Sequence, residues 1–275
     1  MLNKTVFLFI GLALITVVFT INSCKPKNAD AVTPDSLSVD SLVNSPCMLL
    51  SERINDVLFR AYEYDTAQLL LRMAEYSGNA TANRILKRYR FDYTQNRLVR
   101  ITETNLAARD QSFIYEFDYD SDKKLQTIRP FRVFNSGPRA VDTLAVKYDT
   151  RDYISELSSV RTGIRKWQYD SVGNVTKHLI RLPNMLTDSI LAEFSTYDNK
   201  INLYGFSRTI QLLRLLNGQA PSRRNPLVYM ERGQSVQTIY QYNNRSIATQ
   251  AIVKMKALGD TVLRETVFSY QLECR

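Results

Sequence analysis

The sequence predicts an all-β protein: a large, curved antiparallel meander of hairpins with one short inserted helix, either left open or closed into a barrel. Three observations lead to this fold class. A tyrosine and aspartate segment recurs along the chain, its bulky residues fall on every second position, and only one interruption has helical periodicity. With 44% apolar and 11% aromatic residues, the chain can bury a substantial core.

The recurring segment occurs eight times. Examples are YRFDYTQNRLVRI from Tyr89, YEFDYDSDKKLQTI from Tyr115 and WQYDSVGNVTKHL from Trp167. The spacing between successive anchoring tyrosines is 21 to 29 residues, with one gap of 45, and such a period indicates a repeat architecture. The anchors are Tyr64, Tyr93, Tyr119, Tyr148, Tyr169, Tyr197, Tyr242 and Tyr270.

Within one unit the alternation has period two. Tyr115, Phe117 and Tyr119 alternate with Glu116 and Asp118. Since successive side chains of a strand point to opposite faces, this pattern predicts a half-buried strand with rings inward and charges outward.

An aspartate follows most of the anchoring tyrosines, as at Asp120, Asp149, Asp170 and Asp198. Aspartate side chains accept hydrogen bonds from backbone N–H groups two residues on, and Gly173 supplies a left-handed conformation at little cost. We therefore interpret these aspartates as turn formers rather than catalytic acids.

The long gap is predicted to contain an insert, residues 206–230, made of a helix and a loop. Ser207 can cap the helix and Asn217-Gly218 can end it. Pro221 and Pro226 are expected to prevent regular structure afterwards. The apolar residues that would share one face of the helix are Ile210, Leu213 and Leu216. The insert is expected to plug or cover one end of the sheet.

The N-terminus predicts export. Lys4 precedes an apolar run of 17 residues, 5–21, and a positive residue followed by an apolar core is typical of a signal peptide, here 1–23, expected to be helical. The run is also close to the length that spans a bilayer, so a retained transmembrane anchor is the alternative. Ile21-Asn22-Ser23-Cys24 resembles the lipobox of bacterial lipoproteins, which implies lipid attachment at Cys24.

Residues 24–46 are predicted to be a flexible tether. The segment has three prolines and no aromatic residue, so it cannot bury enough surface to order itself. Asp-Ser or Asp-Thr followed by a small or aliphatic residue occurs seven times, which resembles the acceptor motif for O-linked glycans in exported proteins of Bacteroidetes-type bacteria. Ser36 and Ser41 in the tether are the most accessible of these positions, although β-turns also enrich the same dipeptides.

Two cysteines remain once Cys24 carries lipid. Cys47 and Cys274 lie at opposite ends of the predicted domain, 47–275, and an exported chain meets an oxidising compartment. A disulfide between them would stabilise the fold by about 4–5 kcal/mol in the chain-entropy model. The alternative is two buried free thiols.

The repeats resemble the YD repeats of large secreted shell proteins. A closer resemblance is to lipoproteins of Bacteroidetes-type bacteria whose domain of unknown function is described as having a porin-like fold. The similarity covers 47–275 and rests on YDNKINLYGF from Tyr197, the leucine-rich insert, RRNPLVY around Arg224 and YQYNN from Tyr240. Leu203 stands where proline is common in that family. The resemblance implies a wide, curved antiparallel sheet and no assigned activity or site residue.

Most catalytic and metal chemistry lacks its signature here. With one histidine, His178, which we expect at the surface, a multi-histidine metal site is impossible, and we predict no metal and no cofactor. No phosphate-binding glycine loop and no Gly-x-Ser-x-Gly motif occur. The net charge of +9, or +8 after loss of Lys4 with the signal, is read as a solvated basic surface or an affinity for anionic lipid or polysaccharide. Export argues against nucleic acid as a partner.

We therefore predict a lipoprotein held at the outer membrane, on its periplasmic side, with a water-soluble barrel or cradle rather than a spanning one. The domain would act as a binding or structural scaffold without catalysis, with an envelope protein or glycan as its partner; the sequence leaves its oligomeric state open. Its interior rings either fill a core or bind an apolar or carbohydrate ligand by stacking. The alternative function is an envelope glycan hydrolase that uses two carboxylates.

Overall fold

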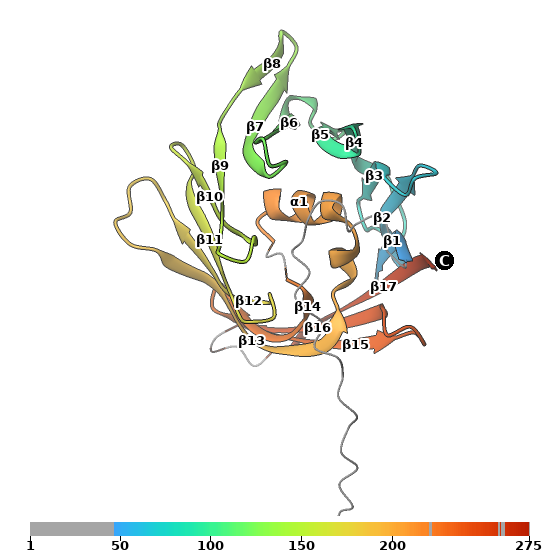
Figure 1. The fold of residues 1–275 in the computed structure, drawn as a ribbon. Coiled ribbons are helices and arrows are strands. Elements are labelled where there is room, and N and C mark those ends of the chain that lie inside the picture. Colours follow the sequence, from blue (N-terminus) through green and yellow to red (C-terminus); the bar gives the residue numbers. More distant parts are fainter. Residues whose placement is uncertain (1–46, 220–221, 258, 260–261, 275) are drawn as a thin grey trace, which may run out of the picture. The chain divides into compact units, whose positions relative to one another are not determined.

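The computed structural model describes residues 47–219, 222–257, 259 and 262–274. They form antiparallel strands, one α-helix and two short 3-10 helices (Figure 1). The predicted signal helix and tether lie outside these residues. The strands are β1 (Cys47–Ile54), β2 (Val57–Tyr64), β3 (Leu70–Tyr76), β4 (Ile85–Thr94), β5 (Arg97–Asn105), β6 (Ser112–Tyr119), β7 (Leu125–Phe134), β8 (Gly137–Ala140), β9 (Leu144–Tyr148), β10 (Ile154–Ser159), β11 (Gly163–Tyr169), β12 (Val175–Arg181), β13 (Ser189–Ile201), β14 (Arg224–Glu231), β15 (Gln234–Tyr242), β16 (Ala248–Ala257) and β17 (Arg264–Cys274).

The sheet closes on itself. Every strand of the ring pairs with the next one, with β7 pairing with β9 and also with the short β8, and β17 pairs with β1. The closed ring of the described residues therefore has sixteen strands, and the short β8 extends β7 beyond it. The predicted antiparallel meander with one short helix is confirmed, and the alternative left open by the sequence is resolved in favour of a barrel.

The seam between β1 and β17 carries a covalent link. Cys47 lies directly opposite Cys274 in the strand register, and the two form a disulfide. Tyr270, Leu272 and Cys274 pack against the core from the inner face of β17, as their alternation predicts. Closure leaves neither terminal strand with an unpaired edge.

Several hairpin turns at one end of the barrel are built by aspartate or asparagine side chains. The Asp120 Oδ1 accepts hydrogen bonds from the backbone N–H groups of Asp122 and Lys124, and the Asp170 Oδ1 accepts from those of Val172 and Asn174. Asp149 and Asn243 repeat this pattern two and four residues on. The interpretation of Asp120, Asp149 and Asp170 as turn formers is confirmed.

The anchoring tyrosines connect neighbouring units at this same end, which we call the aspartate-turn end. Six of the eight hydroxyls donate to a backbone carbonyl in the preceding unit, and that of Tyr242 donates to the Asp198 carboxylate instead. The pairs are Tyr64 to Leu49, Tyr93 to Leu70, Tyr119 to Leu98, Tyr148 to Leu125, Tyr169 to Ile154 and Tyr197 to Val175. Because the acceptor usually begins the strand after the previous turn, one tyrosine per unit ties each hairpin to the next.

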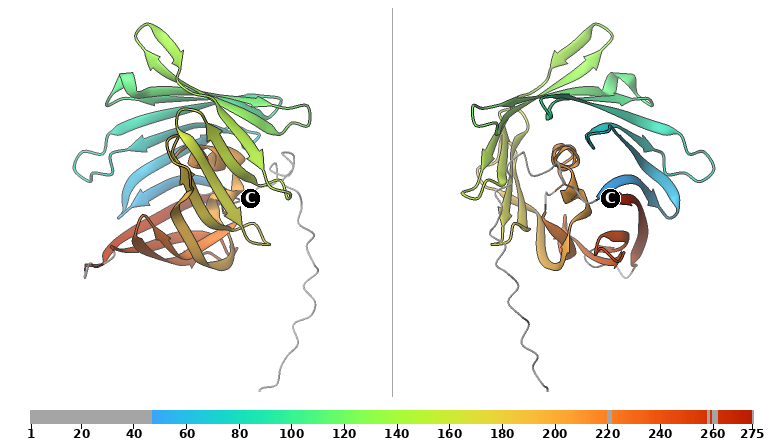
Figure 2. Two further views of the ribbon diagram at one scale, coloured as in Figure 1. Left: turned by 90° about the vertical axis from the view of Figure 1, so that its left-hand side faces the viewer. Right: turned by 45° about the vertical axis from the view of Figure 1, so that its right-hand side comes forward.

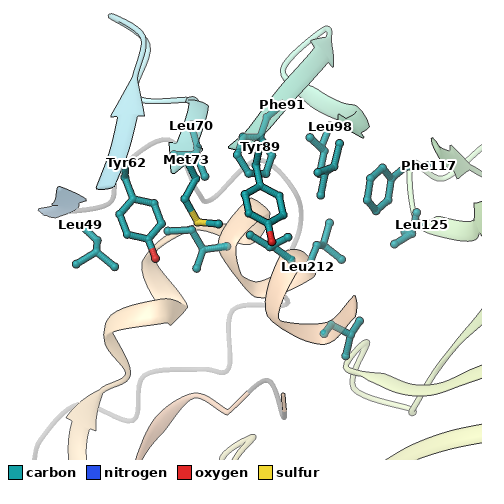
Figure 3. Packing of buried hydrophobic residues seen from close by; sticks show 14 of the residues in the cluster. Leu49, Tyr62, Leu70, Met73, Tyr89, Phe91, Leu98, Phe117, Leu125 and Leu212 are labelled. Carbon is teal, nitrogen blue, oxygen red and sulfur yellow. The ribbon is translucent and has the colours of Figure 1, made fainter. Parts of the chain in front are cut away.

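Between β13 and β14 the chain enters the barrel as η3 (Leu203–Phe206) and α1 (Arg208–Leu216). The Ser207 side chain accepts from the Ile210 N–H and Asn217 is the C-cap, as predicted. Leu212 and Leu215 are buried in addition to Ile210 and Leu213, because strands surround the helix instead of covering one face (Figure 2). Figure 3 shows Leu212 beneath wall residues that include Tyr62, Met73 and Tyr89.

The prediction of an irregular chain through residue 230 is wrong, because β14 begins at Arg224 and contains Pro226. Pro226 is tolerated there since its ladder with β13 is irregular on both sides of the pair with Tyr197, and β15 pairs only from Val228 onward. Asp198 likewise lies within β13 rather than in a hairpin turn. Its carboxylate accepts from the Asn225 backbone and side-chain N–H groups and so holds β14.

The outward face of the wall is lined with ion pairs between neighbouring strands. Glu63, for example, lies between Tyr62 and Tyr64, whose rings pack in the core, and therefore points outward. Other outward charges alternate with core residues in the same way. Pairs of this kind are Arg72–Glu63, Arg100–Glu116, Arg129–Asp118, Lys147–Glu156, Lys177–Glu193 and Lys254–Glu265.

Candidate functional site

A cavity of about 270 Å³ lies between the insert and the barrel wall at the aspartate-turn end. Its volume is close to the lower limit of the cavities that hold small organic ligands. The wall residues that line it include Leu49, Tyr64, Leu70, Tyr93, Leu98 and Tyr119, and the insert adds Leu203, Phe206, Ile210 and Leu212. The cavity is therefore enclosed mainly by aliphatic and aromatic groups.

The tyrosine hydroxyls around the cavity already have partners. Those of Tyr64 and Tyr119 donate to backbone carbonyls at 3.0 and 2.8 Å. The Tyr93 hydroxyl donates to the Leu70 carbonyl at 3.0 Å and lies 2.9 Å from the Thr209 Oγ1 on the insert. Burial raises the pKa of Tyr93 and of Tyr119 to about 12, so both stay neutral at physiological pH. The cavity thus meets ring carbon rather than free hydroxyl groups.

The polar side of the cavity is positively charged. Arg97, Lys123 and Arg208 line it, and the described lining contains no aspartate or glutamate. The Arg97 guanidinium lies 5.8 Å from the Tyr119 ring centroid and donates to the Gln95 Oε1 at 3.1 Å. None of these three cations forms an ion pair with a carboxylate of the described residues.

A buried carboxylate fixes the insert to the wall. Glu52 is 1% exposed; its Oε2 accepts from the Tyr204 hydroxyl at 2.8 Å, and its Oε1 accepts from the Tyr62 hydroxyl. The Arg60 guanidinium lies 3.6 Å from Glu52 and 3.1 Å from Glu75. A buried charge held by three partners is costly to break, so this cluster locks η3 against β1 and β2.

Glu52 and Glu75 are two carboxylates that share one arginine, Arg60, inside the barrel, and a glycosidase would need such a pair to face a substrate. Glu52, however, lies beneath the insert and accepts hydrogen bonds from two tyrosines. A substrate could reach it only if the insert left the barrel. Asp120, Asp149 and Asp170 lie in three different turns, and the described residues contain no group of three metal-ligating side chains.

His178 corrects a prediction, because it is 3% exposed instead of lying at the surface. Its ring stacks on Trp167, with centroids 5.2 Å apart, and both its Nε2 and the Trp167 Nε1 lack a hydrogen-bond partner among the described residues. Burial, followed by the nearby positive charges of Arg165 and Arg232, lowers the pKa of His178 to about 4. The imidazole is therefore neutral at physiological pH.

The predicted site residues differ in what the structure says of them. Cys47 and Cys274 are brought together at the seam. Cys24, Ser36 and Ser41 lie outside the described residues. Sequence reasoning missed the cluster around Glu52 and the cavity, because both depend on which wall strands the insert meets, and no local pattern encodes that contact.

Among the described residues, no helix has both the length and the apolar character needed to cross a bilayer.

Known proteins were compared with the chain by sequence family, by curated sequence and by structure. No family model matches, and no curated protein matches. A crystal structure of a porin-like protein from Bacteroides uniformis superposes with a TM-score of 0.56 at 11% identity, over 84% of this chain and 97% of that one. The barrel has a porin-like fold. At such low identity the likeness extends to the fold alone.

Two more distant structures were also found. A porin-like protein from Bacteroides vulgatus gives a TM-score of 0.37 at 12% identity, over 81% of this chain and 97% of that one. A Tc holotoxin pore from Photorhabdus luminescens gives 0.35 at 14% identity, over 76% of this chain and 10% of that one.

Proposed function

We propose that this chain is an exported lipoprotein, anchored at Cys24 to the periplasmic side of the outer membrane, whose barrel is a non-catalytic binding or structural scaffold. The lipobox-like Ile21-Asn22-Ser23-Cys24 supports the anchor. The proposal includes membership of the Bacteroidetes-type lipoprotein family with YD-like repeats, the Cys47–Cys274 disulfide in the exported protein, and O-glycosylation at Ser36 and Ser41. An envelope protein or glycan remains the proposed partner.

The non-catalytic role is supported by the observation that the carboxylates of the turns and of Glu52 already accept hydrogen bonds within the protein. The turn aspartates accept backbone N–H groups of their own turns, as Asp120, Asp149 and Asp170 do. Glu52 is held by tyrosines and an arginine beneath the insert. A glycosidase needs one carboxylic acid able to donate a proton and a second carboxylate facing the same substrate. The described carboxylates with low exposure are already structural.

The charged outer wall supports a barrel surrounded by water. A lysine or arginine on the lipid-facing side of a membrane barrel costs about 2–4 kcal/mol near the bilayer midplane. Arg90, Arg100 and Arg129 all occupy outward positions along the central strands. A wall carrying many such residues is compatible with water and unfavourable in lipid, so the membrane link is assigned to the acyl chains on Cys24.

The anchor is tested by labelling cells with radioactive palmitate and separating their membranes. The wild-type chain should carry label and fractionate with the outer membrane, and Cys24→Ala should lose both properties, while Cys47→Ala keeps the label. Label that persists in Cys24→Ala would contradict the anchor.

The scaffold role is tested by capture from intact envelopes. The native, membrane-bound protein is crosslinked and purified, and the proteins and glycans that co-purify are identified. A reproducible partner supports the scaffold, whereas recovery of lipids alone removes it. Release of soluble sugars from isolated envelope glycans, abolished by Glu75→Gln, would favour the hydrolase instead.

A further inference from the structure

The cavity between the insert and the wall has two unlike sides, and together they define the chemistry of a ligand. The buried lining residues are mostly aliphatic, whereas Arg97 and Arg208 are half-buried and Lys123 is exposed, so the three cations lie nearer the rim. We propose that this cavity binds a single-chain anionic amphiphile from the membrane: an acyl chain inside, with its carboxylate or phosphate head at the three cations. The inference deepens the binding role proposed above and rests on it.

The apolar side selects against sugars. A buried sugar needs hydrogen-bond partners for its hydroxyl groups, because an unpaired buried polar group costs about 1–3 kcal/mol. The hydroxyls of Tyr64, Tyr93 and Tyr119 already donate to backbone carbonyls. An acyl chain, in contrast, gains free energy simply by leaving water, about 0.8 kcal/mol for each buried methylene.

The rim selects for a negative head group. Arg208 is the first residue of α1, where a cation opposes the helix dipole instead of complementing it. Arg208 is half-buried and Arg97 is half-buried. All three cations line one cavity whose described lining contains no carboxylate, so an anionic head group at the mouth would be attracted to them.

The position of the cavity supplies the source of the ligand. Cys47 and Met48 line it, so the segment that leads back to Cys24 joins the barrel beside the cavity. That segment has 22 residues, 25–46, and as a flexible coil it spans about 25 Å in root-mean-square terms. A chain anchored at Cys24 therefore keeps the cavity within reach of the bilayer, where single-chain amphiphiles are present.

The test uses the full exported chain in phosphatidylcholine nanodiscs, with empty nanodiscs subtracted. The probe is dansyl-labelled undecanoic acid, and the comparison compound is its uncharged primary amide. Fluorescence titration should show saturable binding of the acid, with weaker binding of the amide. Acetate alone and maltose should not displace the acid, because one lacks the chain and the other lacks both apolar chain and charge.

Three variants separate the two sides of the cavity. Ala67→Trp places a bulky ring at an exposed lining position and should weaken both compounds by about tenfold or more. The double variant Lys123→Gln with Arg208→Gln should weaken the acid by about tenfold, less so at about 0.5 M salt, and leave the amide within about twofold. Arg90→Gln, on the outer wall, removes a charge without touching the cavity and should change neither.

The inference is overturned if acid and amide bind alike, if Ala67→Trp binds as the wild type does, or if maltose displaces the acid. It is also overturned if the wild type does not bind the acid but a variant with Leu37, Leu42 and Val43 replaced by serine does. That result would mean that the chain's own segment occupies the cavity. Each of these results leaves palmitate labelling and partner capture unchanged, so failure here is distinct from failure of the scaffold role.

Discussion

Removal of the covalent link between Cys47 and Cys274 separates what the disulfide contributes from what strand pairing contributes. Seven residue pairs join β1 to β17, and these remain in a variant that lacks both sulfur atoms. We therefore expect Cys47→Ala with Cys274→Ala to fold into the same barrel at lower stability. The link encloses nearly the whole described chain, because the two cysteines are 227 residues apart.

The expected loss follows from the size of that loop. In the chain-entropy model a crosslink over this separation raises the free energy of the unfolded chain by about 5 kcal/mol at 25 °C, slightly more than for a loop of about 100 residues. Natural disulfides usually contribute about 2–5 kcal/mol, so the model value is an upper bound. With a urea dependence of about 3 kcal/mol per molar for a domain of this size, the unfolding midpoint should fall by about 1–2 M.

Urea unfolding followed by the fluorescence of Trp167, the single tryptophan, measures this loss. Wild-type protein is compared with and without reductant, and the double alanine variant is treated in the same way. Reductant should lower the wild-type midpoint to that of the variant and should leave the variant unchanged. The reasoning would be refuted if reductant left the wild-type urea midpoint unchanged, or if the wild-type midpoint equalled that of the variant under oxidising conditions.

Three further perturbations follow from the contacts of single residues. His178 has a pKa of about 4 in the folded state and 6.5 in the unfolded state, so between these values the unfolded state binds one more proton. The free energy of unfolding should therefore fall by about 3 kcal/mol as the pH drops from 7 to 4. His178→Phe should lack this pH-dependent loss when unfolding is measured across the same range. Tyr93→Phe removes a hydroxyl that contacts both a wall strand and the insert, so it should lower the free energy of unfolding by about 1–2 kcal/mol. Tyr76→Phe, outside the repeat units, should lower it by less than about 0.5 kcal/mol. Equal urea midpoints for the two variants would contradict this role of Tyr93. Asp170→Ala should cost about 1–3 kcal/mol and lower the thermal midpoint, because the Asp170 carboxylate accepts three hydrogen bonds. Asp122→Ala, in the turn between β6 and β7, should leave the midpoint unchanged.

The elements that sequence reasoning predicted well are those with local causes. The turn at Asp120 depends on backbone groups two and four residues away, and the helix start at Ser207 depends on Ile210. The pairing of Cys47 with Cys274 is long-range, yet it was predictable because, if Cys24 carries lipid as proposed, two cysteines remain and they have one way to pair.

The elements that it missed have causes on other strands. His178 follows a turn and is flanked by Lys177, which suggests an exposed position, but its inward face is set by the pairing with Trp167 on β11. Pro226 reads as a strand breaker, and it is accommodated only because the β13–β14 ladder is irregular beside it. In both cases the decisive partner lies on another strand, and a local sequence pattern does not reveal which strand that is.

The cavity follows from the width of the ring. A barrel of sixteen strands is too wide for its own side chains to fill, and barrels of that size ordinarily contain water. Here the insert occupies the aspartate-turn end, and α1 is buried on almost every side because the wall surrounds it. One helix of nine residues and a short 3-10 turn do not fill the area within sixteen strands, so a space remains that is lined by Tyr64, Tyr93 and Tyr119 on the wall and by Leu212 on the insert. The same tyrosine bonds that fix the repeat therefore also fix the walls of the site.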